Sequence, residues 1–177
     1  IKELSSGNIA KMFTKPVNGS YVPLPLLTFA IEYKLSGEKP LPFHATNLLL
    51  HLFCVFLVFR LLRLFGLDLI YAAFGALIFG VHPMHVESVA WITERKDVLY
   101  GAFYLGAVIM YLRYVSGSEQ KTKYLLYSLL LFLGSLLSKI EAVALPLTLL
   151  LADYLMKRPF RWKVITEKIP FFLLSLV

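Results

Sequence analysis

Residues that could do chemistry are concentrated in one short stretch, HPMHVESVAWITERKD at residues 82–97, which lies between two apolar segments. Ionisable side chains are costly near hydrocarbon, and those at the end of a membrane helix usually face a cavity. The stretch is therefore the first candidate for a functional site. Its candidate cavity-lining residues are His82, His85 and Trp91, and its charged candidates are Glu87, Arg95, Lys96 and Asp97.

The four charged candidates indicate two kinds of role. Arg95 and Lys96 could pair with a phosphate, because arginine binds phosphate oxygens bidentately and lysine supplies a point charge. A solvated helix end is the alternative for this charged run. Glu87 and Asp97 are the candidates for general acid or base catalysis, with ion pairing to Arg95 as the alternative.

A metal site is a third possibility for the same stretch. Zinc accepts two imidazoles and a carboxylate, the side chains of His82, His85 and Glu87. Their spacing does not place all three donors on one helical face, and the single cysteine, Cys54, is far away in the sequence. We therefore predict no metal and no cofactor, although a divalent ion could be accommodated.

A second charged break interrupts the apolar sequence at Lys139 and Glu141, between apolar runs at residues 124–137 and 142–156. Lys139 is a further candidate for phosphate binding, and a salt bridge to Glu141 or another acid is its alternative. Glu141 is a candidate cavity-lining residue. A single helix over residues 124–156 is a weaker alternative, because it would bury both charges near the middle of the bilayer.

A polar stripe marks the start of another apolar run. His44, Asn47 and His51 are spaced three and four residues apart, so they share one face of a helix. Interhelical hydrogen bonding is the favoured interpretation, because polar side chains commonly join membrane helices. Contact with a ligand is the alternative, which makes His44 and Asn47 candidate cavity-lining residues.

Composition identifies the elements that must hold these side chains. The chain is 58% hydrophobic and 16% charged, with a mean hydropathy of +0.71, which predicts an all-α, polytopic integral membrane protein. We expect a non-cytoplasmic loop with interfacial helices over residues 1–42 and a transmembrane domain over residues 43–177. The predicted spans, five and the start of a sixth, are residues 43–65, 67–81, 98–115, 124–137, 142–156 and 169–177.

The run at residues 67–81 is short for a span, since it covers about 22 Å against about 30 Å of hydrocarbon. Residues 82–97 should therefore begin below the membrane surface, in the floor of a cavity. A helix that starts at Pro83 and continues to residue 92 or beyond would place Glu87, Trp91 and Arg95 on one face.

The formal charge of +7 does not indicate nucleic acid as a partner, because the basic residues are not gathered on one face with aromatic residues. They lie at the ends of apolar runs, which is a signal of membrane topology, and membrane lipids are the expected partner. If the spans alternate, most of these basic residues share one side, which makes that side cytoplasmic. Residues 1–42, residues 82–97 and the Lys139 break then share the opposite side. Two distant stretches should thus form one non-cytoplasmic cavity.

The sequence HPMHVESVAWITERKDVL, residues 82–99, resembles the transmembrane O-mannosyltransferases that act on cadherins, and their bacterial relatives with tetratricopeptide repeats. Three other segments resemble the same family: FHATNLLLHL at residues 43–52, NGSYVPLPLLTFAIEY at 18–33 and SKIEAVALPLTLLLADY at 138–154. The resemblance therefore covers most of the chain.

The resemblance implies a C-type glycosyltransferase fold in a bacterial inner membrane or an endoplasmic reticulum membrane. The expected reaction transfers a sugar, mannose in this family, from a polyprenyl or dolichyl phosphate to a protein or glycan acceptor on the non-cytoplasmic side. By this likeness His82, His85, Glu87, Arg95 and Asp97 line the donor and acceptor cavity, and Lys139 approaches the lipid phosphate. The catalytic acid is expected upstream of Ile1, so the chain is interpreted as a fragment that is inactive alone.

Two other classes of protein remain open at this point. An ion- or proton-coupled transporter would use the same buried charges to carry ions, but it predicts repeated halves with broken helices. A noncatalytic lipid-binding membrane subunit would bind the lipid without transferring a sugar.

Overall fold

The computed structural model describes residues 4–17, 19–117, 121–159 and 161–176. Ten α-helices follow one another in this part of the chain: α1 Ser6–Thr14, α2 Pro23–Ser36, α3 Pro40–Leu64, α4 Leu69–Val81, α5 Val86–Ala90, α6 Arg95–Val115, α7 Lys121–Leu136, α8 Leu145–Leu155, α9 Trp162–Thr166 and α10 Ile169–Leu174. Short 3-10 helices connect some of them: η1 Pro83–His85, η2 Ile92–Glu94 and η3 Ile140–Ala144. The described residues contain no β-strand, so the all-α prediction is confirmed.

Two helical segments are long and apolar enough to cross a membrane. They are α3 with 25 residues and the segment Ile92–Val115 with 24 residues, which is η2 and α6 together. The pair Leu69–Val81 and Pro83–Ala90 would form a third span, with a bend of 50° between its halves. The helical membrane protein expected from composition is thus confirmed, whereas the count of about five spans stays a prediction.

The bend at the end of α4 falls where the sequence predicted it. His82 has an extended backbone, with φ −64° and ψ 129°, and Pro83 opens η1 directly after it. Proline cannot continue the hydrogen bonds of a preceding helix, and it disfavours helical backbone at the residue before it. The α4 helix therefore ends at Val81, after 13 residues or about 20 Å.

The prediction of one continuous helix from Pro83 past residue 92 is wrong, because the helix is interrupted at Trp91. Trp91 is extended, with φ −87° and ψ 121°, so the helix stops at Ala90 and starts again at Ile92. Glu87, Trp91 and Arg95 consequently do not share a face. Glu87 and Trp91 are exposed, whereas Arg95 is buried.

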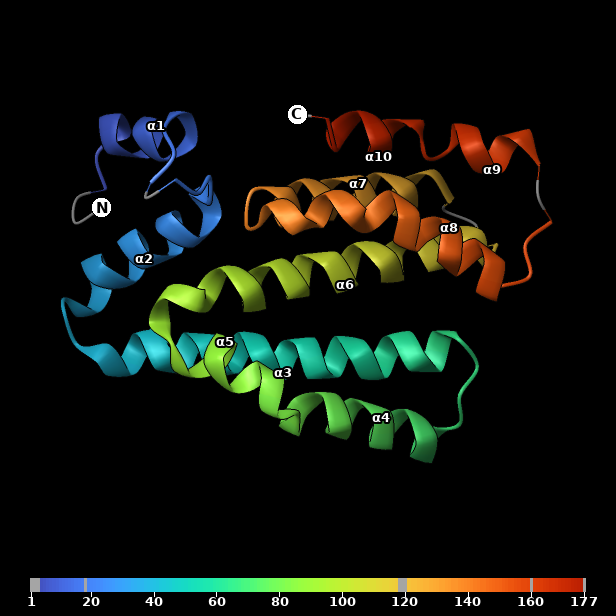
Figure 1. Ribbon diagram of the computed structural model, residues 1–177, viewed down its shortest axis with the longest axis horizontal. Helices are drawn as coiled ribbons and strands as arrows, with labels where there is room; N and C mark the ends of the chain where they lie inside the picture. The colour runs from blue at the N-terminus through green and yellow to red at the C-terminus, as the bar shows by residue number, and fades with distance from the viewer. Residues whose placement is uncertain (1–3, 18, 118–120, 160, 177) are drawn as a thin grey trace.

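A single helix over residues 124–156 is excluded by the break after α7. Lys139 is extended, with φ −159° and ψ 138°, and η3 separates it from α8. The chain reverses direction there, so that α7 and α8 run in opposite directions (Figure 1). The Lys139 side chain is therefore at a turn and not in the middle of a helix.

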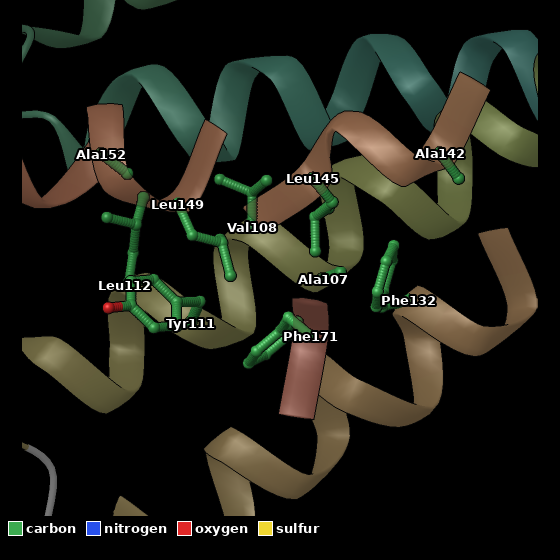
Figure 2. Packing of buried hydrophobic residues seen from close by; sticks show 10 residues of the cluster. All are labelled: Ala107, Val108, Tyr111, Leu112, Phe132, Ala142, Leu145, Leu149, Ala152 and Phe171. Atoms are coloured by element: carbon green, nitrogen blue, oxygen red, sulfur yellow. The ribbon is translucent and has the colours of Figure 1, made fainter. Parts of the chain in front are cut away.

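The main hydrophobic core is built around α6 (Figure 2). Small residues allow α7 to approach α6 closely: a Cβ on Gly134 would lie 3.0 Å from the Phe103 ring. Ser128 on α7 donates a hydrogen bond to the Ala107 carbonyl at 2.8 Å. The buried members of this core are Ala107, Val108, Tyr111, Leu112, Phe132, Ala142, Leu145, Leu149, Ala152 and Phe171.

The ends of the long helices gather at two opposite ends of the molecule (Figure 1). One end carries the start of α3, the start of α6 and the turn between α7 and α8. The C-terminal ends of α3, α6 and α8 gather at the other end, with the start of α4. The convergence of the two charged stretches predicted from alternating spans is therefore present in the fold.

Candidate functional site

An ion pair joins the two charged breaks. Lys139, at the turn after α7, places Nζ 2.6 Å from Asp97 Oδ1 in the first turn of α6, and 3.6 Å from Glu141 Oε1. Ser88 on α5 donates a hydrogen bond to the other Asp97 oxygen at 3.1 Å. The contact brings residues 82–97 and the Lys139 turn together, and it is the salt bridge weighed for Lys139 from sequence.

A cavity of about 630 Å³ opens beside this ion pair. Lys96, Lys139 and Glu141 are its charged lining residues, and most of the remaining wall is apolar. The other lining residues come from the loop before α2, the end of α7, η3 and the end of α10: Gly19, Ser20, Tyr21, Val22, Leu133, Leu136, Leu137, Ile140, Val143, Leu174, Ser175 and Leu176. A ligand with a charged head and an apolar tail would find a complementary surface for each part.

The backbone fixes two sides of this cavity to each other. The Leu24 N–H, at the start of α2, donates to the Leu137 carbonyl at 3.2 Å. Pro23 and Pro25 are buried in the first turn of α2, a position where proline is favoured because no helical partner exists for its nitrogen. The N-terminal segment is thereby held against the end of α7.

Lys139 supplies a persistent positive charge to the cavity. Burial alone would lower its pKa, but the hydrogen bond and charge of Asp97, together with Glu141, outweigh burial and raise the pKa above its usual value. Lys96 is the second cation on the wall, and its Nζ lies 3.2 Å from Glu94 Oε1. Both side chains are only partly buried, so their charges remain accessible from the cavity.

Arg95 occupies a different place from the one expected. Its side chain is fully buried, and NH1 lies 2.7 Å from Glu32 Oε2 on α2. Nε donates to Asn47 Oδ1 at 2.8 Å and NH2 donates to the Phe43 carbonyl at 2.8 Å. The guanidinium also lies over the Phe29 ring, 4.7 Å from its centroid. A phosphate could reach Arg95 only by displacing these partners, so the side chain joins α2 and α3 to α6 instead of lining the cavity.

Asn47 completes this buried cluster. Its Nδ2 donates to the Trp91 carbonyl at 2.9 Å, which satisfies a backbone group exposed by the extended residue between α5 and η2. His51, one turn further along α3, contacts the Gly80 carbonyl at 3.0 Å. Asn47 and His51 thus make the interhelical hydrogen bonds that were the favoured interpretation of the stripe, while His44 is exposed.

The histidines surround a second, smaller cavity of about 290 Å³. His51, His82 and His85 line it, with apolar residues from α3, α4 and α5. The Nδ1 of His85 contacts the Phe79 carbonyl at 2.8 Å, which also accepts the His82 N–H at 3.4 Å, so the rings of His51 and His85 both contact carbonyls at the end of α4. Nowhere in the described ranges do three His, Cys, Asp or Glu side chains form a group that could hold a metal ion.

The predicted site residues are therefore divided between two cavities and a buried cluster. Lys96, Lys139 and Glu141 line the larger cavity, His82 and His85 line the smaller one, and Arg95 and Asn47 lie inside the protein. The exposed residues Glu87, Trp91 and His44 line neither.

A buried ionic network at the opposite end of the molecule was not predicted. Lys168 Nζ pairs with Asp153, and Arg158 NH1 lies 2.7 Å from Glu167 Oε2. Tyr111 and Tyr114 on α6 donate hydrogen bonds to Asp153 and Glu167 respectively. The adjacent charges Glu167 and Lys168, directly before the apolar run at 169–177, were the signal available in the sequence.

Comparison of the sequence with known proteins shows which family the chain belongs to. The family model described as dolichyl-phosphate-mannose-protein mannosyltransferase matches residues 15–177. The chain thus belongs to a class of membrane glycosyltransferases, and within that class it is a member of the dolichyl-phosphate-mannose-protein mannosyltransferase family.

Three relatives illustrate the similarity. Protein O-mannosyl-transferase Tmtc1 of Drosophila melanogaster is 36% identical over 139 residues, 78% of this chain and 16% of the relative. Human protein O-mannosyl-transferase TMTC4 is 35% identical over 144 residues, 70% of this chain and 19% of the relative. Human protein O-mannosyl-transferase TMTC3 is 36% identical over 94 residues, 53% of this chain and 10% of the relative. The chain spans about a tenth to a fifth of these relatives' lengths. No solved structure matches it.

Proposed function

We propose that this chain forms the donor-binding part of a membrane enzyme that transfers mannose from a polyprenyl or dolichyl phosphate to a hydroxyl of a protein or glycan acceptor. Membership in a mannosyltransferase family supports the transferred sugar, and the names of the three relatives support a protein acceptor. The single structural observation that carries the proposal is the cavity beside the Lys139 and Asp97 ion pair.

The cavity is suited to a lipid phosphate because its charge and its apolar wall lie side by side. Lys139 and Lys96 would contact the phosphate oxygens, and the surface from Leu133 to Leu137 would contact the first isoprene units. A lysine whose pKa is raised stays protonated at neutral pH, so the binding charge does not depend on modest changes of pH. Asp97 and Glu141 hold that lysine at the cavity wall.

The proposed reaction is a direct displacement at the anomeric carbon. An acceptor oxygen forms the new bond to that carbon, and the bond from the carbon to the phosphate oxygen breaks. The phosphate leaves with the bonding electron pair, and the charges of Lys139 and Lys96 stabilise the developing negative charge. The acceptor proton passes to a carboxylate, which we propose lies outside residues 1–177.

Glu87 and Asp97 have unequal claims to a role in proton transfer. Asp97 is paired with Lys139 and Ser88, so we assign it to offsetting part of the Lys139 charge and not to proton transfer. Glu87 is exposed near the smaller cavity and remains a candidate for contact with the acceptor. Arg95 is assigned a positioning role, because its buried contacts hold α2 and the cavity loop that precedes it.

We place the cavity on the non-cytoplasmic side of an endoplasmic reticulum or bacterial inner membrane. The C-terminal ends of α3, α6 and α8 gather at the end of the molecule away from Lys139 (Figure 1). Basic residues are enriched on the cytoplasmic side of membrane proteins, and these helix ends carry or precede Arg60, Arg63, Arg113, Lys157 and Arg158.

The test compares Lys139→Ala and Lys139→Arg with the wild-type full-length enzyme, using a polyprenyl phosphate mannose donor and measuring release of lipid phosphate. Loss of one charge-assisted contact should lower kcat/KM about 10- to 100-fold in Lys139→Ala, with partial activity in Lys139→Arg. Lys34→Ala, which removes an exposed lysine on α2, is the matched control. Wild-type turnover by Lys139→Ala, or donor binding without any transfer by the wild-type protein, would contradict the proposal.

A further inference from the structure

Four charged side chains, three of them buried and Arg158 partly exposed, form a network at the end of the molecule away from Lys139. Lys168 is completely buried, and Asp153 and Glu167 are 4% and 9% exposed. Lys168 Nζ also donates to the Tyr111 hydroxyl at 2.7 Å and to the Val164 carbonyl at 2.9 Å. Arg158 NH2 donates to Glu167 Oε1 at 3.1 Å. The two acids and two bases balance each other, so the network carries no net charge.

The stability that such a network adds is small. Removing charges from water offsets most of the attraction between them, so a buried ion pair often contributes no more than an apolar pair of the same volume. What it does impose is geometry, because each ammonium or carboxylate must stay within hydrogen-bonding distance of its partners. The network should therefore be judged by what it positions.

The network holds the start of α10, and the end of α10 forms part of the cavity wall. Lys168 directly precedes α10, and Phe171 one turn later packs against Phe132 and Tyr111, with ring centroids 5.8 and 6.3 Å apart. The Ser175 hydroxyl then contacts the Val143 carbonyl in η3 at 3.3 Å. Leu174, Ser175 and Leu176 line the larger cavity. From Lys168 to Ser175 the helix spans about 10 Å.

We propose that Lys168 and Asp153 are positioning residues that set the cavity wall formed by the end of α10. Neither residue lines the cavity. Lys168 fixes one end of a short helix whose other end meets η3, next to the turn that carries Lys139. The positioning itself is independent of the ligand, whereas its effect on donor affinity rests on the proposed function.

The position of α10 can be measured without an activity assay. Cysteines introduced in the full-length protein by Val143→Cys and Ser175→Cys should be joined by a short bifunctional thiol reagent, because Ser175 Oγ lies 3.3 Å from the Val143 carbonyl. Adding Lys168→Met leaves the buried Asp153 with only its longer cation contact, to Arg158 NH1 at 3.4 Å, and the yield of crosslinked protein should fall at least about fivefold. Arg63→Gln, which alters a basic residue in the last turn of α3, is the control and should leave the yield unchanged.

A neutral double variant separates positioning from stability. Asp153→Asn with Lys168→Met leaves no unpaired buried charge, so it should fold even if the single variant does not, and its melting temperature should match the wild type. We expect its crosslinking yield to stay at least about twofold low, and its KM for a polyprenyl phosphate mannose donor to rise about five- to tenfold with kcat nearly unchanged.

The outcomes are distinct. Wild-type crosslinking in the double variant would overturn the proposal, because α10 would then keep its position without the ion pair. Reduced crosslinking with a raised KM supports positioning and the donor role of the cavity together. Reduced crosslinking in a protein whose wild type binds no polyprenyl phosphate supports positioning and refutes the proposed function instead.

Discussion

Lys139 Nζ lies 2.6 Å from Asp97 Oδ1, although one residue follows α7 and the other lies in the first turn of α6. The pair tethers the start of α6 to the turn between α7 and α8. It also sets the charge beside the larger cavity, because Asp97 neutralises part of the Lys139 charge before any ligand binds. Changing either partner should therefore change the affinity of the cavity for an anion, in opposite directions.

Asp97→Asn should tighten binding of polyprenyl phosphate by the full-length protein. Without the Asp97 carboxylate, only Glu141 at 3.6 Å offsets the charge of the Lys139 ammonium, and we expect the Kd to fall about three- to tenfold at low ionic strength. Titration calorimetry in detergent measures the change. Asp68→Asn, which removes an exposed acid at the start of α4, is the control. Weaker binding by Asp97→Asn would mean that orientation of Lys139 matters more than its net charge.

Arg95→Met should destabilise the protein more than it affects the cavity directly. The substitution leaves the Glu32 carboxylate without its cation and the Asn47 amide without its donor, for a loss of about 3–5 kcal/mol in the free energy of unfolding. Arg95→Lys should lose less, but it cannot reproduce the planar set of contacts. Denaturant unfolding in detergent measures both, with Arg60→Met on the exposed face of α3 as the control. Unchanged unfolding with lost donor binding would return Arg95 to the cavity.

The ionic network predicts a sensitivity to acid. Burial alone would raise the pKa of Glu167, but hydrogen bonds from Arg158 and Tyr114, with the charges of Arg158 and Lys168, lower it below its usual value of 4.5. A carboxylate with a lowered folded-state pKa contributes stability above pH 4.5, and this contribution is lost as the pH falls through the folded-state pKa.

The melting temperature of the wild-type protein should therefore fall as the pH drops below about 4.5. Glu167→Gln should be less stable at pH 7 and should lose less on acidification, because the titrating group is absent. Parallel acid profiles for the two proteins would show that Glu167 is not held ionised by its partners.

Several features of the fold follow from local sequence. The length of the run at residues 67–81 and Pro83 predicted the break after α4, because both signals act within a few residues. The convergence of the Lys139 turn with residues 82–97 followed from alternating spans. Neither inference required knowledge of which helices pack together.

The role of Arg95 required that knowledge. Arg95 and Asp97 are two positions apart in the first turn of α6, so their side chains leave the helix in widely different directions. Asp97 faces Lys139, whereas Arg95 faces Glu32 and Asn47. The placement of α2 and α3 decides that Arg95 is buried among helices, whereas Asp97 pairs with a lysine of the cavity wall. The network around Lys168 was missed for the same reason, since its members come from α6, α8, α9 and the loops that follow α8 and α9.

The most direct test of the account is to map where the lipid donor binds. A polyprenyl phosphate with a photoreactive group on its first isoprene unit should be crosslinked to the full-length protein in detergent, and the modified peptides should be identified by mass spectrometry. The account predicts labelling within residues 133–143 and 174–176, and loss of that labelling in Lys139→Ala. Labelling confined to the histidine-lined cavity at His51, His82 and His85 would contradict it.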